Sequence, residues 1–151
     1  MFKKALVGLV VLLLAVQFYR PARNTSAAAG PNDITAKHAV PAKVQDALQR
    51  ACYDCHSNNT HYPWYAEVQP VRWWLDSHIT DGKRHLNFSE YGTYTAKRAT
   101  KKAEEIADEV EHHEMPLKSY TWMHPEARLT PDEIKLVTAW AEKLRDEITP
   151  P

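Results

Sequence analysis

The feature that most constrains this chain is the stretch Cys52-Tyr-Asp-Cys55-His56, which contains both of its cysteines. Two cysteines separated by two residues can form a redox dithiol, supply half of a zinc site, or attach a haem covalently through two thioether bonds. Only the third interpretation requires the histidine directly behind the second cysteine, which is His56. The rest of the sequence has to discriminate among the three chemistries.

The pattern before the motif argues against a redox dithiol. Apolar residues recur at helical spacing and run directly into Cys52, as Val44, Ala47, Leu48 and Ala51. The cysteines therefore follow the C-terminal end of a helix. A reactive dithiol instead needs the positive end of the helix dipole at the N-terminus, which lowers the pKa of the thiol.

A zinc site needs a fourth ligand in addition to Cys52, Cys55 and His56. His61, His112 or His113 could supply it, so zinc stays open as an alternative. No second CxxC or HxxxH motif accompanies the first. Haem attachment uses all the positions of the motif, because the two thiols add to the two vinyl groups and the histidine binds the iron.

An apolar run near the N-terminus predicts export. Residues 5–18 carry no charge, follow Lys3 and Lys4, and end before Tyr19-Arg20-Pro21. No small-residue cleavage site follows at once, which favours an uncleaved anchor over a removed signal. We expect residues 1–21 to be this anchor or signal segment, with residues 5–19 holding the protein in the inner membrane and the remainder on the periplasmic side.

The domain organisation follows from composition. Residues 22–37 are small, polar and interrupted by Gly30-Pro31, so they predict a flexible linker. Residues 38–151 then form one domain. Basic and acidic residues balance at 19 each, which gives no indication of a nucleic-acid partner.

Four helical segments and no convincing strand predict an all-α domain. The helices begin after Pro41, run from Pro70 to about Asp81-Gly82, span about 94–113, and start again at Thr130-Pro131. In the third, the residues Lys101, Lys102, Glu104 and Glu105 form a solvated face. The connections 57–69, 83–92 and 114–129 are long for a small bundle, which indicates that something other than protein fills its centre.

A haem iron bound by His56 would take a second axial ligand from methionine or histidine. The main candidate is Met115, because Pro116 ends the third helix there and leaves the methionine at the start of a loop. Met123, His124, His113 and His112 remain alternatives, as does an open site. Propionate groups could accept hydrogen bonds from basic residues of the second helix and its end: Arg72, His78, Lys83, Arg84 and His85. We expect Trp64, Trp73, Trp74 and Trp122 to form pocket walls or core.

Several motifs, in order, resemble the c-type cytochrome superfamily and in particular the small exported haem-binding domain family of bacteria. They are QFYRP (17–21), CYDCHSN (52–58), YPWY (62–65), GKRHLNFSEY (82–91), EMPLKSY (114–120) and HPEARLT (124–130). The resemblance implies a cytochrome c-like helical domain with one covalent haem c. It also implies thioether bonds at Cys52 and Cys55, proximal ligation by His56 and distal ligation by Met115.

The function that follows is single-electron transfer by an exported, membrane-tethered monohaem cytochrome with redox partner proteins at the membrane. Such a protein is not an enzyme and needs no substrate pocket. The alternative is a peroxidase-like haem enzyme or a gas or redox sensor. Its sixth iron site would be open or displaceable, and His112, His113 or Glu114 would act as distal acid or base.

Overall fold

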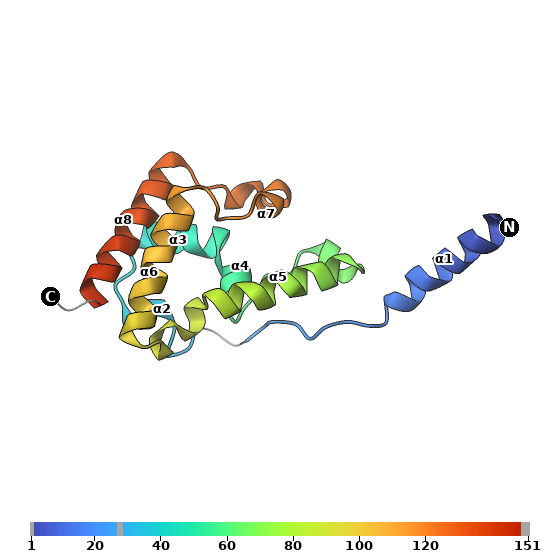
Figure 1. Cartoon of the computed structure of the whole chain (residues 1–151), viewed down its shortest axis with the longest axis horizontal. Helices are drawn as coiled ribbons and strands as arrows, with labels where there is room; N and C mark the ends of the chain where they lie inside the picture. The colour runs from blue at the N-terminus through green and yellow to red at the C-terminus, as the bar shows by residue number, and fades with distance from the viewer. Residues whose placement is uncertain (1, 27–28, 149–151) are drawn as a thin grey trace.

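The structure, a computed structural model, describes residues 2–26 and 29–148 (Figure 1). Over these residues the regular structure is helical, and the one strand-like pairing is an isolated bridge between Thr25 and Asn59. The expectation of an all-α protein is confirmed. The α-helices are α1 (Phe2–Val16), α2 (Ile34–Lys37), α3 (Ala42–Ala51), α4 (Tyr53–His56), α5 (Val71–His85), α6 (Ala96–Glu111), α7 (Lys118–Met123) and α8 (Pro131–Ile148).

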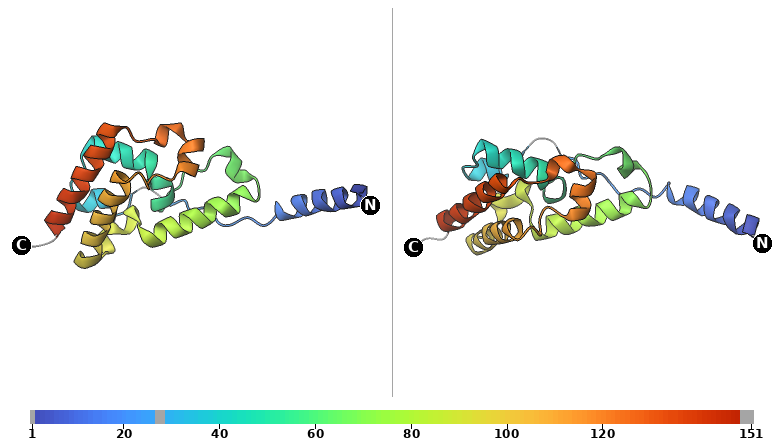
Figure 2. Two further views of the ribbon diagram at one scale, coloured as in Figure 1. Left: turned by 45° about the horizontal axis from the view of Figure 1, so that its top comes forward. Right: turned by 90° about the horizontal axis from the view of Figure 1, so that it is seen from above.

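The main core lies where α6, α8 and α3 pack together, at the end of the body farthest from α1 (Figures 1 and 2). The apolar faces predicted for these helices are the faces that are buried, with Ala103 and Ala141 fully enclosed between α6 and α8. Small residues at these positions allow the two helices to approach closely. Trp140 on α8 joins the core and donates its indole N–H to the carbonyl of Ala39 at 3.2 Å.

Side-chain caps start α6 and α8 at the predicted places. The hydroxyl of Thr95 accepts a hydrogen bond from the Arg98 amide. Before α8, Glu133 accepts from the Thr130 amide at 2.8 Å, and the Thr130 hydroxyl accepts from the Glu133 amide at 3.3 Å. This reciprocal capping box satisfies amide groups that the first helical turn leaves unpaired.

Helix α5 continues past the predicted end at Asp81-Gly82 and stops at His85. Gly82 lies inside the helix because α4 packs against it at that point. A Cβ at this position would lie 2.7 Å from the carbonyl oxygen of Cys55. The glycine therefore serves a close approach between two segments instead of ending the helix.

Residues 22–37, predicted to be a flexible linker, make specific contacts with the body. The Asn24 side chain donates to the Ser57 carbonyl and to the Thr60 hydroxyl, each at 2.8 Å. Asp33 caps α2, and Ile34 is fully buried in the main core. The prediction of a free tether is wrong for the described part of this stretch, and residues 27 and 28 lie outside the described residues. Polar composition suggested a linker, but asparagine and aspartate also satisfy backbone groups at a surface.

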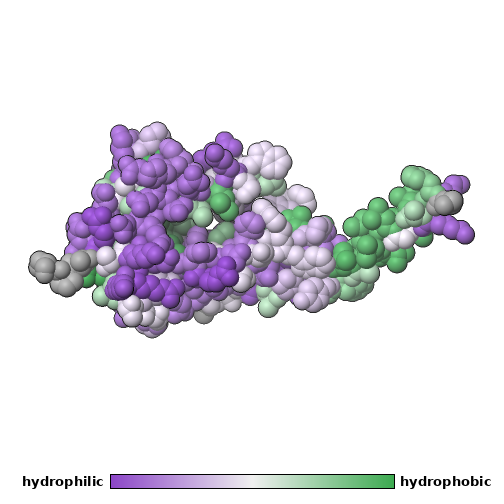
Figure 3. Space-filling view, viewed as in Figure 1, coloured by the Kyte–Doolittle hydropathy of each residue, from purple (hydrophilic) through white to green (hydrophobic). Residues whose placement is uncertain are grey.

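Helix α1 points away from the body, and its apolar side chains are exposed (Figures 1 and 3). It begins at Phe2 and ends at Val16, a few residues before the predicted end of the anchor. Among the described helices, none combines the length and the apolar character needed to cross a membrane. The expected membrane-spanning helix is thus not supported.

The three long connections contain short helical turns. These are the 3-10 helices η1 (Trp64–Glu67), η2 (Phe88–Thr93) and η3 (Pro125–Ala127), together with α7. Each turn packs on a neighbouring element, with η1 against α5, η2 against α2 and α4, and η3 against α3 and α7. Two of the connections line the predicted space in the middle of the body, one with Leu86 and Phe88 and the other with residues 115–117 and Tyr120.

Candidate functional site

A cavity of about 370 Å³ opens in the middle of the body, bounded by α3, α4, α5, α6 and the segment 115–120. In Figure 3 it is visible as a hollow with apolar atoms at its base, surrounded by hydrophilic side chains. The volume lies in the range of sites that bind small molecules and cofactors. The apolar part of its wall consists of Leu48, Ala51, Leu86, Phe88, Ile106, Val110, Pro116 and Leu117.

His56 is at this wall, and one of its ring nitrogens is already engaged. Nδ1 lies 3.1 Å from the carbonyl oxygen of Leu86, to which it donates when it carries the proton. Burial lowers the pKa of His56, so the neutral ring is favoured. In the neutral ring with Nδ1 protonated, Nε2 keeps a free lone pair. A hydrogen bond on the second nitrogen is the usual arrangement of a histidine that binds a metal.

Helix α4 holds the histidine through aromatic packing. The Tyr53 ring stacks on Phe88 with centroids 5.0 Å apart, and the His56 ring meets the edge of Phe88 at 6.5 Å. Phe88 is buried, so its ring has little freedom to move. It lies at the start of η2, within the motif GKRHLNFSEY.

Cys52 and Cys55 both line the cavity as free thiols. Burial raises the pKa of Cys52 to about 12 and that of Cys55 to about 11, with the neighbouring Cys55 and Asp54 as secondary causes. Both groups therefore remain protonated at neutral pH. A redox-active dithiol needs the opposite shift, towards the thiolate.

Of the candidates for the second axial position, Met115 is the one that lines the cavity. Its amide donates to the Glu109 carbonyl at 3.0 Å, which ties the start of the loop to α6. Met123 is exposed and does not contribute to the wall. His124 has both ring nitrogens at hydrogen-bond distance from other side chains, those of Tyr65 and Glu126.

His112 and His113 end α6 on the outside of the body. Both are exposed, and neither lines the cavity. The backbone of His113 is left-handed, with φ 59°, and turns the chain from α6 towards Met115. The two histidines thus take part in the turn, and the methionine after them reaches the site.

The rim of the cavity carries charged and polar groups from α5 and α6. His78 and His85 are at the wall, as the sequence suggested for propionate contacts, whereas Lys83, Arg84 and Arg72 are not. Sequence reasoning missed a second group, Lys102, Glu105 and Glu109, of which Lys102 and Glu105 were expected on the solvated face. These residues flank Ile106 at helical spacing, which is the signal that identifies them.

The tryptophans are not at the cavity. Trp64, Trp74 and Trp122 are exposed, Trp73 is partly exposed, and none of the four lines the wall. The expectation that they form pocket walls or core is wrong. The walls are made by aliphatic residues together with Phe88 and Tyr120, since these lie on the helix faces that enclose the space.

The alternative of a zinc site has no support in the geometry. Within residues 2–26 and 29–148, no group of three or more histidine, cysteine, aspartate or glutamate side chains is placed to hold a metal ion. His61, one candidate for the fourth ligand, is exposed and does not line the cavity. Cys52 and Cys55 therefore lack the partners that a tetrahedral site requires.

The donor set and the cavity fit a haem. A large flat cofactor needs an apolar wall, and the aliphatic residues of α3 and α6 supply one. An axial ligand needs a free imidazole nitrogen, which the contact between His56 and Leu86 leaves available. Two thiols and a thioether open on the same space. The fold and the cavity are those of a small helical haem-binding protein.

The chain belongs to the haem-binding domain family, whose model matches residues 11–143. The match begins inside α1 and includes residues 22–37, in agreement with the contacts that this stretch makes with the body. No curated protein and no solved structure matches the chain significantly.

Proposed function

We propose that the protein is an exported monohaem c-type cytochrome that transfers single electrons between partner proteins. One observation carries the proposal: Cys52, Cys55, His56 and Met115 open on a single apolar cavity. A covalent haem with histidine and methionine as axial ligands requires these four groups together. Haem binding itself follows from the family; covalent attachment, ligand identity and electron transfer are the proposed parts.

In this proposal, each thiol adds its sulfur and its proton across one vinyl group, which forms a thioether bond and consumes the double bond. Neutral thiols are the starting form, in agreement with the raised pKa values of Cys52 and Cys55. His56 would bind the iron through Nε2, because Nδ1 is engaged with Leu86. Met115, which lines the same cavity, would bind through its sulfur.

The bound haem would supply reversible one-electron chemistry. The chain would tune it in two ways. The aliphatic wall excludes water and disfavours the more highly charged oxidised state. The hydrogen bond from His56 to the Leu86 carbonyl fixes the orientation of the ring and increases the electron donation by Nε2.

Export and membrane association are also proposed. They are supported by α1, a helix of 15 residues whose apolar side chains are exposed and whose first turn contains Lys3 and Lys4. An exposed apolar surface of this size requires a lipid or protein cover. Attachment near the membrane would raise the effective concentration of the haem domain for membrane-bound redox partners.

The alternative function, a peroxidase-like enzyme or a sensor with an open sixth site, needs an acid or base facing the iron. The groups suggested for it, His112, His113 and Glu114, do not line the cavity. Glu109 and Glu105 do, so they are the residues available to this alternative. Electron transfer is favoured because Met115 also lines the cavity and can supply a sixth ligand.

The test is intact mass together with the pyridine haemochrome spectrum of the chain produced with a haem attachment system. A mass increase of one haem and a spectrum of two thioether bonds are expected for wild type, and neither for Cys52→Ala with Cys55→Ala.

The axial ligand is tested by the ferric spectrum, which should show the long-wavelength charge-transfer band of thioether-bound iron. Met115→Ala should abolish this band, and Met123→Ala should keep it. A high-spin ferric wild type that binds cyanide rapidly would favour the alternative.

A further inference from the structure

Large apolar side chains are exposed not only on α1 but also around the junction between α1 and the body. Phe18 and Tyr19 are 90% and 73% exposed, and Trp64 on η1 is 79% exposed. Val68 and Trp74 are each about half exposed. We call these five residues the junction surface. In Figure 3, this end of the body is pale and adjoins the apolar α1, whereas the opposite end is strongly hydrophilic.

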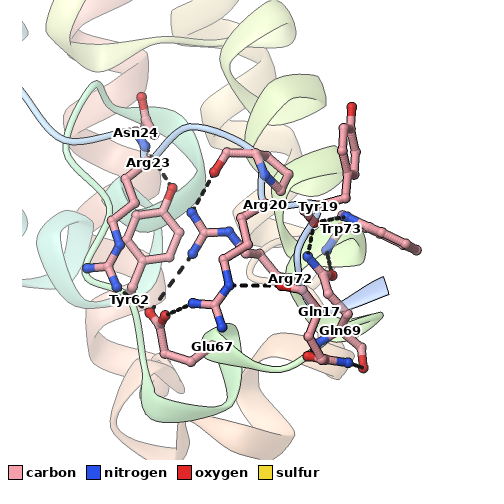
Figure 4. Close-up of polar contacts among 11 residues, drawn as sticks. Gln17, Tyr19, Arg20, Arg23, Asn24, Tyr62, Glu67, Gln69, Arg72 and Trp73 are labelled. Carbon is pink, nitrogen blue, oxygen red and sulfur yellow. Dashed lines mark hydrogen bonds and ion pairs between the residues drawn. The ribbon is translucent and has the colours of Figure 1, made fainter. Parts of the chain in front are cut away.

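Hydrogen bonds join Gln17 and Tyr19, at the end of α1, to the start of α5. The Gln69 amide donates to the Gln17 side chain at 2.9 Å, and the Gln69 side chain donates to the Tyr19 carbonyl at 2.8 Å. The Trp73 indole donates to the same carbonyl at 3.0 Å, and its ring meets the edge of the Tyr19 ring (Figure 4). The end of α1 is therefore fixed against the start of α5 and does not hang on a free chain.

A cluster of arginines lies beside these aromatic side chains (Figure 4). Arg20 and Arg23 are about half exposed and both pair with Glu67. Arg72 is buried, donates to the Pro21 carbonyl at 2.7 Å, and has no hydrogen-bond partner for Nε. Three cations face one carboxylate, so the cluster keeps an excess of positive charge.

We propose that the junction surface and Arg20 and Arg23 lie in the headgroup region of an anionic phospholipid membrane, into which α1 inserts. The inference deepens the proposed membrane association by assigning a second lipid contact to the haem domain itself. Aromatic side chains with one polar end favour the membrane interface, and arginines beside it attract anionic headgroups.

Continuity with α1 identifies the lipid surface as the occupant. The chain passes from the apolar residues of α1 directly into Phe18 and Tyr19, and Tyr19 contacts Trp73 and Gln69 at the start of α5. Any lipid that covers α1 would therefore reach the junction surface as well. Exposed aromatic side chains bordered by arginines match this boundary between apolar and charged layers.

This contact would fix the orientation of the haem cavity. Trp74 is near the start of α5, whereas Gly82 and His85 at the cavity are near its end. Gly82 follows Trp74 by eight positions, which corresponds to about 12 Å along the helix. The cavity would thus be held at a set distance from the lipid, with α6 and α8 farther away.

The test uses the full chain and two kinds of vesicle, one of phosphatidylglycerol with phosphatidylethanolamine and one of phosphatidylcholine alone. The double variant Trp64→Ser and Trp74→Ser should weaken partition into both kinds of vesicle by about tenfold. The reason is that it removes two exposed indoles whose apolar surface the membrane would bury. Leu136→Ser, at a half-exposed leucine of α8, should leave partition unchanged. Circular dichroism and the haem spectrum verify that each variant is folded.

The charge contribution is tested separately. Arg20→Gln with Arg23→Gln should weaken binding to the anionic vesicles by about fivefold per arginine and leave binding to phosphatidylcholine unchanged. Lys143→Gln on α8, at an exposed lysine, is the matched control and should have no effect. Equal loss on both vesicles would overturn the role of the arginines.

Hydrogen exchange on vesicles separates the two proposals. Slower exchange in residues 62–74 on anionic vesicles, with α8 unchanged, supports the junction surface. Slower exchange confined to α1 would overturn the inference and leave membrane association standing. A full chain that does not bind either vesicle would overturn both, and would point to a protein as the cover of α1.

Discussion

The phenol of Tyr120 donates a hydrogen bond to the carboxylate of Asp54 at 2.8 Å. Asp54 lies between the two cysteines of the motif, and Tyr120 lies on α7, five residues after Met115. The contact therefore joins the segment that contains the cysteines to the segment that contains the methionine. Burial raises the pKa of Tyr120, so the phenol keeps its proton at all ordinary pH values.

We predict that Tyr120→Phe weakens the attachment of the segment that contains Met115 to the segment that contains the two cysteines. A hydrogen bond to a charged group contributes about 1.5–3 kcal/mol, so stability should fall by about this amount. The charge-transfer band of thioether-bound iron should become weaker on mild heating, and cyanide should bind faster. Spectroscopic titration with cyanide measures the second effect.

Tyr91→Phe is the control, because it also removes a phenol hydroxyl that donates a hydrogen bond, here to the backbone carbonyl of Ala99 at 2.7 Å. Tyr91 does not line the cavity. Its loss should lower stability without changing the band or the cyanide rate. Equal cyanide rates in Tyr120→Phe and wild type would contradict the role of the Asp54 contact.

Gly82→Ala should displace the cysteine motif from its contact with α5. The new Cβ would lie 2.7 Å from the Cys55 carbonyl oxygen and 3.2 Å from the Cys55 Cβ, so α4 and α5 would have to separate. Overpacking of this kind costs about 1–3 kcal/mol. Thermal melting and the yield of attached haem should both decrease. Gly30→Ala, where nothing lies within 4 Å, should leave both unchanged.

Removal of the haem should destabilise the whole domain. At about 24 cal/mol per Å³, an empty cavity of this volume costs up to about 9 kcal/mol, which is comparable to the stability of a small domain. The double variant Cys52→Ala and Cys55→Ala, produced without haem, should unfold at a much lower denaturant concentration than the haem-loaded wild type. Chemical denaturation followed by circular dichroism measures this difference. Equal midpoints would show that the cavity closes without the cofactor.

The α8 cap predicts a dependence of stability on pH. Hydrogen bonds from Thr130, followed by the charge of Arg50, lower the pKa of Glu133. A carboxylate with a lowered pKa stabilises the fold above its unfolded pKa, and this contribution disappears as the pH falls through the folded value. Stability should therefore decrease below about pH 4, where the free carboxyl titrates. Glu133→Gln should remove this part of the acid dependence.

The magnitude is that of one helix cap, about 1 kcal/mol at neutral pH, since solvent screens the partly exposed pair with Arg50. Urea unfolding at several pH values measures it. Lys143→Gln on the exposed side of α8 keeps the cap and should retain the wild-type pH profile. Parallel pH profiles for wild type and Glu133→Gln would contradict the assignment.

Local patterns were sufficient to predict much of this protein. The spacing of apolar residues defined α3, α6 and α8, because each has one face that must be buried. The motif from Cys52 to His56 and the methionine before Pro116 identified groups that the fold brings to one cavity. These features depend on residues that are close in sequence, so their order alone reveals them.

Other features depend on segments that meet only after folding. Gly82 suggested a helix end, but the approach of Cys55 explains its presence inside α5. Residues 22–37 suggested a linker, but Ile34 and Asn24 find partners more than thirty residues away or in the core. The tryptophans suggested pocket walls, yet Trp64 and Trp74 are exposed.

The sequence by itself determined the chemistry that is available, since two thiols, an imidazole and a thioether are properties of the residues present. The tertiary structure alone decided which of these groups share a space. It placed Met115 at the cavity with His56, directed Nδ1 of that histidine to the Leu86 carbonyl, and left His112 and His113 outside. The reason is physical: ligation requires groups to converge in space, and convergence depends on how helices pack, not on spacing along the chain.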